Sequence, residues 1–371
     1  MDASEARVLE IGDLSFIKEA FPDRTTLLWT GRRPPAYWVD RSPSVAIDPS
    51  DYSDCTPARF VRGMRDAAAG RYDVVVAYLP LYSPWHPRNG VRSLFGDPLH
   101  PWRALTRGLG ISWLRLTKPP VPLVVVDLND HFGIRRPSFF LLDKADVVFK
   151  RELPADRWQV LAGSAHPALP TLRIRSSRRW QERLEKLRPI SLPVPRVDTA
   201  LMSGDFPDKT ADIFFSGNTA LNSWVRRTGI VALKELAARG IKVDIPDQIL
   251  PREQFYRRMS QAWLAWSPSG FGWDCYRTGE AAQCLTVPVV NHPTVERHRP
   301  LLQGQHLIQY DIEGDGLARA IEAALADKDR LKQMALAARA HVKTHLMLRP
   351  LASHIIEAGL TSAARRGRSR A

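Results

Sequence analysis

Residues 263–291 constrain the fold of this chain more than any other stretch. They read WLAWSPSGFGWDCYRTGEAAQCLTVPVVN. An apolar run ends in Ser-Pro-Ser, a loop with Gly270 and Gly272 follows, and a helix-like segment leads to a second apolar run at 287–290. The order strand, loop, helix, strand predicts one crossover of a parallel sheet. Such sheets bind their ligands beyond the carboxyl ends of the strands, where this loop stands.

The first helical turn after the loop carries Arg277 and, three residues later, Glu280. Free N–H groups and the positive helix end favour a phosphate there, and glycines let the backbone approach it. Arg277 can add charged hydrogen bonds to phosphate oxygens. Glu280 shares its helical face and can accept hydrogen bonds from the vicinal hydroxyls of a ribose. The pattern predicts a nucleoside-diphosphate site, while spacing alone leaves open a plain tight turn followed by an i,i+3 ion pair.

The composition is that of a globular protein with room for two domains. The chain has 371 residues, of which 44% are hydrophobic and 25% charged. No apolar run is long enough to cross a bilayer, and the MDASEAR start lacks the apolar core of a secretion signal. The three cysteines show neither metal-ligand nor disulfide spacing. We therefore expect a soluble cytoplasmic protein.

The net charge of +14 has two local concentrations, residues 173–188 and a C-terminal tail with four arginines. Neither alternates with aromatic residues, and no zinc-finger or RNA-binding signature is present, so we expect no nucleic-acid partner. Basic segments of this kind suit peripheral contact with the anionic inner face of a membrane, or an acidic substrate. The alternative, a solvated helix face and a frayed tail, stays open.

The first half predicts a buried parallel sheet. Nearly continuous apolar runs occupy residues 8–11, 26–29, 73–79, 123–127 and 146–149. Residues 57–69 have helical spacing and suit a crossover, and residues 81–101 read as a long loop. We assign residues 1–195 to an N-terminal Rossmann-like domain.

A proline-rich linker at 196–208 precedes a second α/β pattern, which we assign to a C-terminal Rossmann-like domain at 209–345. Strands are expected at 212–215, 241–245, 263–267, 287–290 and 306–310, with helices at 223–239, 253–259, 317–325 and 328–342. A C-terminal helix at 346–362, which can return to the first domain, and a basic tail at 363–371 complete the chain. The predicted fold class is α/β, with two doubly wound Rossmann-like domains facing a cleft.

Three segments of the second half carry a family resemblance: DIFFSGN at 212–218, SPSGFGWDCYRTGEAAQCLTVPVVN at 267–291, and the helical close at 317–342. They resemble the donor-binding domain of GT-B glycosyltransferases of group 1 type, in the branch of spore-maturation glycosyltransferase-like proteins and, more distantly, exostosin-like proteins. ADVVFKREL at 145–153 is similar to the last strand of the family's N-terminal domain. The resemblance covers about half of the chain and is only architectural over roughly the first 140 residues.

The resemblance implies a role for each matching position. Gly217 and Asn218 would lie beside the donor, and Arg226 or Arg227 would compensate the charge of its diphosphate. The loop residues Gly270, Phe271, Gly272 and Trp273 would cover sugar and phosphates, Arg277 would pair with phosphate, and Glu280 would hold the ribose hydroxyls. Many relatives also have a glutamate at the position of Gly272; here Asp274 is the nearest acid, which leaves the stereochemical course open. The first strand ends in Gly12-Asp13 instead of a fuller glycine loop.

Glycosyl transfer of this kind expels a nucleoside diphosphate from a cationic centre. We expect a metal-independent reaction, without a cofactor beyond the nucleotide-sugar substrate, in which Arg277, Arg226 and the helix N-terminus neutralise the departing charge. An inverting enzyme also needs a general base, for which Asp130 and His131, just past the strand at 123–127, are the candidates. Each can instead be an ordinary turn residue bonded to backbone.

The sequence thus predicts a glycosyltransferase that moves a sugar from a nucleotide-sugar donor to a glycan, lipid-linked or polysaccharide acceptor. Two alternatives stay open: a nucleotide-sugar epimerase or phosphorylase of the same fold, and a non-catalytic basic module that binds membrane or nucleic acid. The sugar, the base, the acceptor and the oligomeric state are not specified by these patterns.

Overall fold

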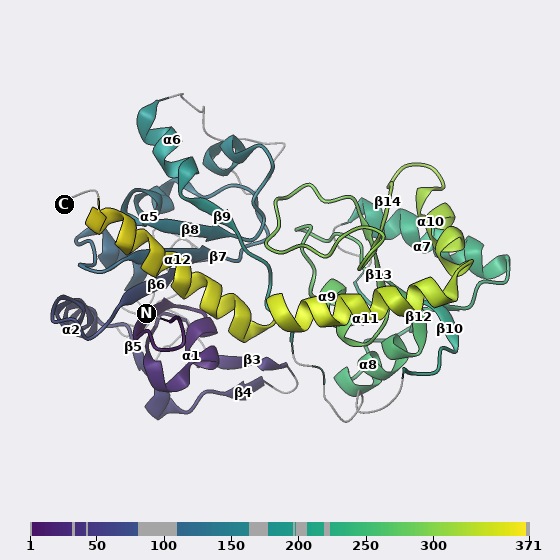
Figure 1. Ribbon diagram of the computed structural model, residues 1–371, viewed down its shortest axis with the longest axis horizontal. Coiled ribbons are helices and arrows are strands. Elements are labelled where there is room, and N and C mark those ends of the chain that lie inside the picture. The colour runs from purple at the N-terminus through teal and green to yellow at the C-terminus, as the bar shows by residue number, and fades with distance from the viewer. Residues whose placement is uncertain are drawn as a thin grey trace. The chain divides into compact units, whose positions relative to one another are not determined.

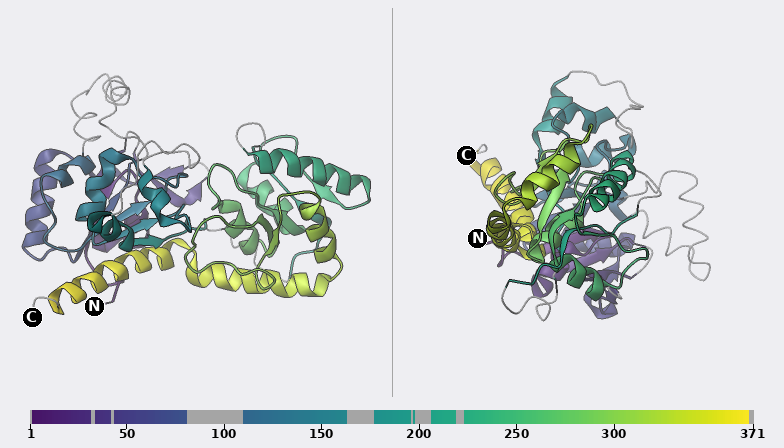
Figure 2. Two further views of the ribbon diagram at one scale, coloured as in Figure 1. Left: turned by 90° about the horizontal axis from the view of Figure 1, so that it is seen from above. Right: turned by 90° about the vertical axis from the view of Figure 1, so that its right-hand side faces the viewer.

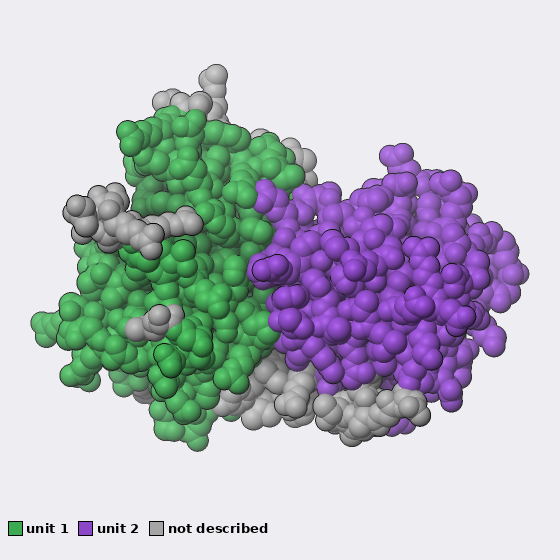
Figure 3. All heavy atoms as spheres, in the orientation of Figure 1, with its two compact units in different colours: residues 1–190, 348–371 green, residues 191–347 purple. Residues whose placement is uncertain are grey.

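The computed structural model describes residues 2–31, 34–41, 44–80, 110–162, 177–195, 197, 206–218 and 223–368. The chain divides into two compact units, coloured separately in Figure 3. Unit 1 comprises Met1–Ile190 and Leu348–Ala371, and unit 2 comprises Ser191–Met347. The long loop expected at 81–101 lies outside the described residues.

Unit 1 is built on a seven-stranded parallel sheet with the order β5-β2-β1-β6-β7-β8-β9 (Figure 1). The strands are β1 Val8–Gly12, β2 Thr25–Trp29, β5 Tyr52–Asp54, β6 Val74–Tyr78, β7 Leu123–Asp127, β8 Val147–Lys150 and β9 Leu187–Pro189. Strands β1, β6 and β7 are buried along their whole length, as their continuous apolar sequences predict. The chain first winds from β1 to β2 and β5, then returns to β6 on the other side of β1, so the switch point of this sheet lies between β1 and β6.

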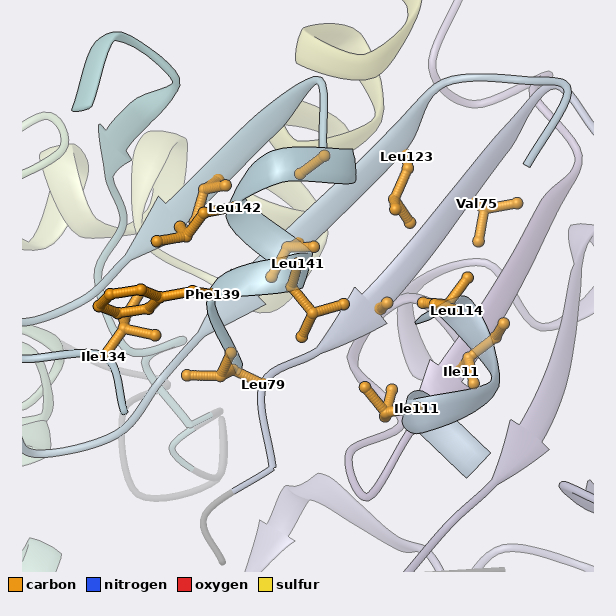
Figure 4. Close-up of a cluster of buried hydrophobic side chains, with 14 of the residues drawn as sticks. Ile11, Val75, Leu79, Ile111, Leu114, Leu123, Ile134, Phe139, Leu141 and Leu142 are labelled. Carbon is orange, nitrogen blue, oxygen red and sulfur yellow. The ribbon is translucent and has the colours of Figure 1, made fainter. Parts of the chain in front are cut away.

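Helices cover both faces of this sheet. One face packs on α2 Pro57–Ala68, α5 Phe139–Lys144 and the 3-10 turn η3 Gly110–Arg115, and Figure 4 shows side chains of this cluster. The other face packs on α1 Phe16–Ala20 and on α12 Leu348–Arg368, which lies beside α1 (Figures 1 and 2). The expected return of the C-terminal helix to the first domain is therefore confirmed.

The remaining elements of unit 1 are short. They are β3 Ala36–Arg41 and β4 Ser44–Ala46, which pair antiparallel, α6 Arg178–Glu185, and the 3-10 turns η1 Pro22–Arg24, η2 Pro49–Asp51, η4 Arg136–Ser138 and η5 Arg157–Ala162. Helix α6 belongs to the basic segment, but Arg183 and Arg179 both bond the carboxylate of Asp143. Part of that positive charge is therefore neutralised within the unit.

Unit 2 repeats the architecture with a five-stranded parallel sheet of order β11-β10-β12-β13-β14. Its strands are β10 Ala211–Phe214, β11 Val243–Asp244, β12 Ala262–Trp266, β13 Val287–Asn291 and β14 Ile308–Tyr310, and its helices are α7 Trp224–Ala238, α8 Arg252–Ser260, α9 Tyr276–Gln283, α10 Gly316–Leu325 and α11 Lys328–His345. Here the winding reverses between β10 and β12. The expected α/β class with two Rossmann-like units is confirmed.

Among the described residues, no helix combines the length and the apolarity needed to cross a bilayer.

Candidate functional site

The switch point of unit 2 brings two loops together. Residues 215–218 follow β10, residues 267–273 follow β12, and these strands are neighbours with parallel register. Both loops therefore emerge at the same edge of the sheet, where open α/β sheets bind ligands. Helix α7 begins after the first loop and α9 after the second.

Hydrogen bonds to two helices and to the sheet hold the glycine loop in place. Ser267 Oγ bonds Thr278 Oγ1 of α9 at 2.9 Å. The backbone N–H of Ser269 donates to Asn291 Oδ1 at the end of β13, 2.9 Å away. Ser223, the N-cap of α7, donates its hydroxyl to Ser269 O at 2.9 Å and accepts from Arg226 N. The loop is thus hydrogen-bonded to α7, to α9 and to β13.

Arg277 extends from the first turn of α9 to the loop that follows β10. Its side chain is buried, Nε donates to Ser216 O at 3.0 Å, and its Cζ lies 5.0 Å from the ring centroid of Phe215. The guanidinium closely approaches Gly217, because a Cβ placed there would lie 2.5 Å from Nη2. Only glycine leaves the guanidinium its present position.

Arg226 reaches the same turn from α7. Its Nη1 donates to Asn218 O at 3.1 Å, and a Cβ placed on Gly270 would lie 2.8 Å from Nη2. Its Nε is buried and has no hydrogen-bond partner among the residues that the structure describes. Burial lowers the pKa of Arg226, and the positive charge of Arg277 lowers it further. In the described part of the chain, no carboxylate pairs with either arginine, so two neighbouring cations lack an anion.

Glu280 lies one turn further along α9 and has a different partner. Its Oε1 accepts a hydrogen bond from Tyr256 Oη of α8 at 3.1 Å, and both side chains are buried. Arg277 bonds Ser216 instead. The i,i+3 ion pair that the spacing left open is therefore not formed.

The other predicted loop residues divide into exposed and buried ones. Phe271 is 70% exposed at the tip of the loop, and the backbone N–H of Gly270 donates to Gly272 O at 2.9 Å. Trp273 is buried, and its Nε1 donates to Asn291 O and His292 O, each at 3.0 Å. Its indole thus joins the end of the loop to the end of β13.

Asp274 also belongs to the base of the loop. Its Oδ2 accepts from Leu192 N at 2.8 Å, and its negative charge acts on Arg297, whose Cζ lies 4.8 Å from the ring centroid of Trp273. This acid, the nearest to the position where many relatives carry a glutamate, links the loop to the first residues of unit 2.

Asp130 and His131 lie at the carboxyl edge of the sheet in unit 1, after β7. A fully buried ion pair between Lys150 Nζ and Asp127 Oδ2, 2.7 Å apart, fixes this loop, since the same ammonium donates to His131 O. Arg151 pairs with the Asp130 carboxylate. Burial lowers the pKa of His131, more than Asp130 raises it, so the ring is neutral at pH 7 and able to accept a proton.

Asp13 is a further candidate residue, and in the sequence it stands where relatives have a fuller glycine loop. It directly follows β1 at the switch point of unit 1, and burial raises its pKa to about 6. A carboxylate with this pKa is a better proton acceptor than an ordinary aspartate and is still ionised at pH 7. An acidic residue directly after a buried strand was the signal available in the sequence.

No group of three or more His, Cys, Asp or Glu side chains within the described ranges is arranged to hold a metal ion.

The chain matches no model of a known protein family, and no curated protein matches it. Solved structures do match. A glycosyltransferase from Rickettsia africae is 10% identical, with a TM-score of 0.52 over 97% of this chain and 99% of that one. An alpha-glucosyltransferase, solved in complex with UDP-glucose and DNA containing an abasic site, is 12% identical, with a TM-score of 0.50 over 95% and 99%. These similarities show the fold of GT-B glycosyltransferases, which the sequence resemblance implied.

Proposed function

We propose that this chain is a glycosyltransferase that takes its sugar from a nucleotide-sugar donor. One observation carries the proposal: Arg226 and Arg277 meet at the switch point of unit 2, beside a glycine loop, and no carboxylate of the described residues pairs with either. A diphosphate supplies the missing negative charge in a form that guanidinium groups bind well. The fold supports the proposal, since the neighbours with the same fold include glycosyltransferases.

In the proposed complex the diphosphate lies between the two guanidinium groups, and the buried Nε of Arg226 donates a hydrogen bond to a phosphate oxygen. Glu280 accepts hydrogen bonds from the ribose hydroxyls. The bond between the anomeric carbon and the diphosphate oxygen breaks, and its electron pair leaves with the diphosphate. The two arginines stabilise this growing charge without reorganising, which is why we propose a reaction that needs no metal ion.

The acceptor hydroxyl oxygen forms the new bond to the anomeric carbon, and its proton passes to a base. Asp13 and His131 are the best candidates, because one has a raised pKa and the other is neutral at pH 7. Asp130 is the weaker of the two residues that the sequence suggested, since Arg151 already occupies its carboxylate. We propose a glycan, lipid-linked or polysaccharide acceptor; peripheral contact with an anionic membrane belongs to the same proposal.

Isothermal titration of the full chain with UDP, GDP, ADP and CDP, each alongside its nucleoside, tests donor binding. At least one diphosphate is expected to bind at least about a hundredfold more tightly than its nucleoside, as two charge-assisted contacts require. Equal affinity of diphosphate and nucleoside in all four pairs would refute the assignment. Incubation of the matching nucleotide sugar without acceptor then separates the reactions, because an epimerase converts the sugar of the donor alone.

A further inference from the structure

Tyr256 and Glu280 form a buried pair between two helices of unit 2. Tyr256 Oη of α8 donates to Glu280 Oε1 of α9 at 3.1 Å, and the side chains are 3% and 8% exposed. A buried carboxylate needs hydrogen-bond donors, and the phenol supplies one from outside the helix that carries the acid.

The hydroxyl of Tyr256 stays protonated around neutral pH and so remains a hydrogen-bond donor. Burial raises the pKa of Tyr256 well above its usual value, and the negative charge of Glu280 raises it further. The guanidinium of Arg252, 5.4 Å from the centre of the Tyr256 ring, lowers this pKa, but by less than burial and Glu280 raise it. The phenol therefore keeps its proton and donates it in the hydrogen bond to Glu280.

The ring of Tyr256 has little freedom to move. It belongs to the core cluster that includes Phe214, Met259 and Ala281, and its centroid lies 5.4 Å from that of Phe255. A hydroxyl on a fixed ring fixes the carboxylate that it bonds. A carboxylate has about four acceptor positions, and the bond from Tyr256 uses one of them.

We infer that Tyr256 is a positioning residue that orients the Glu280 carboxylate for the vicinal hydroxyls of a ribose and so makes the site selective for ribonucleotides. The inference rests on the proposed function, because it takes Glu280 as the ribose contact. Tyr256 itself need not touch the nucleotide.

The test is the ribose selectivity of Tyr256→Phe. Dissociation constants are measured by calorimetry for UDP, GDP, ADP and CDP and for the 2′,3′-dideoxy form of each. The readout is the ratio of the dideoxy dissociation constant to the ribose dissociation constant within one protein. Any unfolded fraction raises both apparent constants by the same factor, so it cancels in the ratio. For wild type, the ratio for the best binder is expected to be on the order of tenfold or more. In Tyr256→Phe it is expected to fall about fivefold, toward unity, with the dideoxy constant nearly unchanged.

Tyr310→Phe is the matched control. Tyr310 is another buried tyrosine of unit 2, and its hydroxyl accepts from Trp266 Nε1 at 3.0 Å, so this variant also loses a buried hydrogen bond. Its ratio is expected to equal that of wild type. Glu280→Gln completes a cycle in which the further change Tyr256→Phe is expected to have no effect on the ratio.

Each outcome decides between the two proposals. If wild type binds none of the four diphosphates, the proposed function fails and this inference fails with it. If wild type prefers ribose and Tyr256→Phe keeps the wild-type ratio, only the role of Tyr256 is refuted. A fall of equal size in Tyr310→Phe also refutes it, because loss of any buried bond would then suffice.

Discussion

Arg226 and Arg277 reach the same turn of unit 2 from two different helices. Arg226 Nη1 bonds Asn218 O, and Arg277 Nε bonds Ser216 O. Each side chain is at least half-buried, and the charge of Arg277 lowers the pKa of Arg226. Two like charges with a buried unpartnered Nε destabilise the free protein and favour an anion. Under the proposed function, this turn gives up stability for the binding of a diphosphate.

Arg226→Met is expected to stabilise the free protein by about 1 kcal/mol, because it removes a poorly satisfied buried cation and keeps most of the side-chain volume. The same change is expected to abolish the rise in Tm that millimolar inorganic pyrophosphate gives wild type. Differential scanning fluorimetry with and without pyrophosphate measures both. Arg227→Met is the control, since Arg227 is the exposed neighbour on α7. An identical pyrophosphate shift in Arg226→Met and wild type would contradict this prediction.

Gly217→Ala and Gly229→Ala are expected to have opposite consequences. A Cβ on Gly217 would lie 2.5 Å from Nη2 at the end of the flexible Arg277 side chain and 3.3 Å from Phe215 Cζ. Because the arginine can move aside, stability should change by no more than about 0.5 kcal/mol while pyrophosphate binding is lost. A Cβ on Gly229 would lie 2.1 Å from Cζ2 of the fully buried Trp266. That overpacking is expected to cost about 1–3 kcal/mol. Urea unfolding and pyrophosphate titration of both variants distinguish a site glycine from a packing glycine; the reverse pattern would refute the assignment.

Much of the fold could be predicted because its strands are buried on both faces. The run at 123–127 coincides with β7, and the helix expected at 57–69 is α2 Pro57–Ala68. Elements without such a signal were missed. β5 is a short, half-buried edge strand with the sequence YSD, and α5, FFLLDK, has no helical spacing of polar residues. Their conformations depend on the neighbours that they pair with or cover.

The site could be predicted only in part for a related reason. Arg277 and Glu280 stand out because they follow a glycine loop in the sequence. The partner of Glu280 is Tyr256, 24 positions away, and the missing partner of Arg226 Nε becomes apparent only from three-dimensional contacts. The raised pKa of Asp13 likewise comes from burial. The sequence shows an aspartate directly after a strand, but it does not show how deeply that side chain is buried.

If Asp13 is the general base, the rate of transfer at low donor concentration should rise with pH and level off above its pKa of about 6. The active form is the carboxylate, which is lost as pH falls through this value. Asp13→Asn is expected to lower kcat by roughly a hundredfold or more and to remove the inflection. His131→Gln is measured beside it; if only that variant loses the inflection, His131 is the base instead.

Glu10 predicts a pH dependence of stability that is separate from catalysis. Burial raises the pKa of this carboxyl on β1 to about 7, against 4.5 in its ordinary state, although Tyr78 Oη and two backbone N–H groups donate to it. Between these values the folded state keeps a proton that the unfolded state releases. The free energy of unfolding should therefore decrease as pH rises from 4.5 to about 7, by at most about 3 kcal/mol. Urea titrations across this range should show the slope in wild type and not in Glu10→Gln; equal slopes would contradict the assignment.

The most direct test of the central claim is the affinity of Arg226→Ala, Arg277→Ala and Arg227→Ala for the nucleoside diphosphate that wild type binds best, measured by calorimetry. Loss of a charge-assisted contact of about 1.5–3 kcal/mol predicts a rise in Kd of roughly ten- to a hundredfold for each of the first two, and no more than about twofold for Arg227→Ala. If folded Arg226→Ala and Arg277→Ala bind as tightly as the Arg227→Ala control, the two arginines do not hold a diphosphate and the proposed function is wrong.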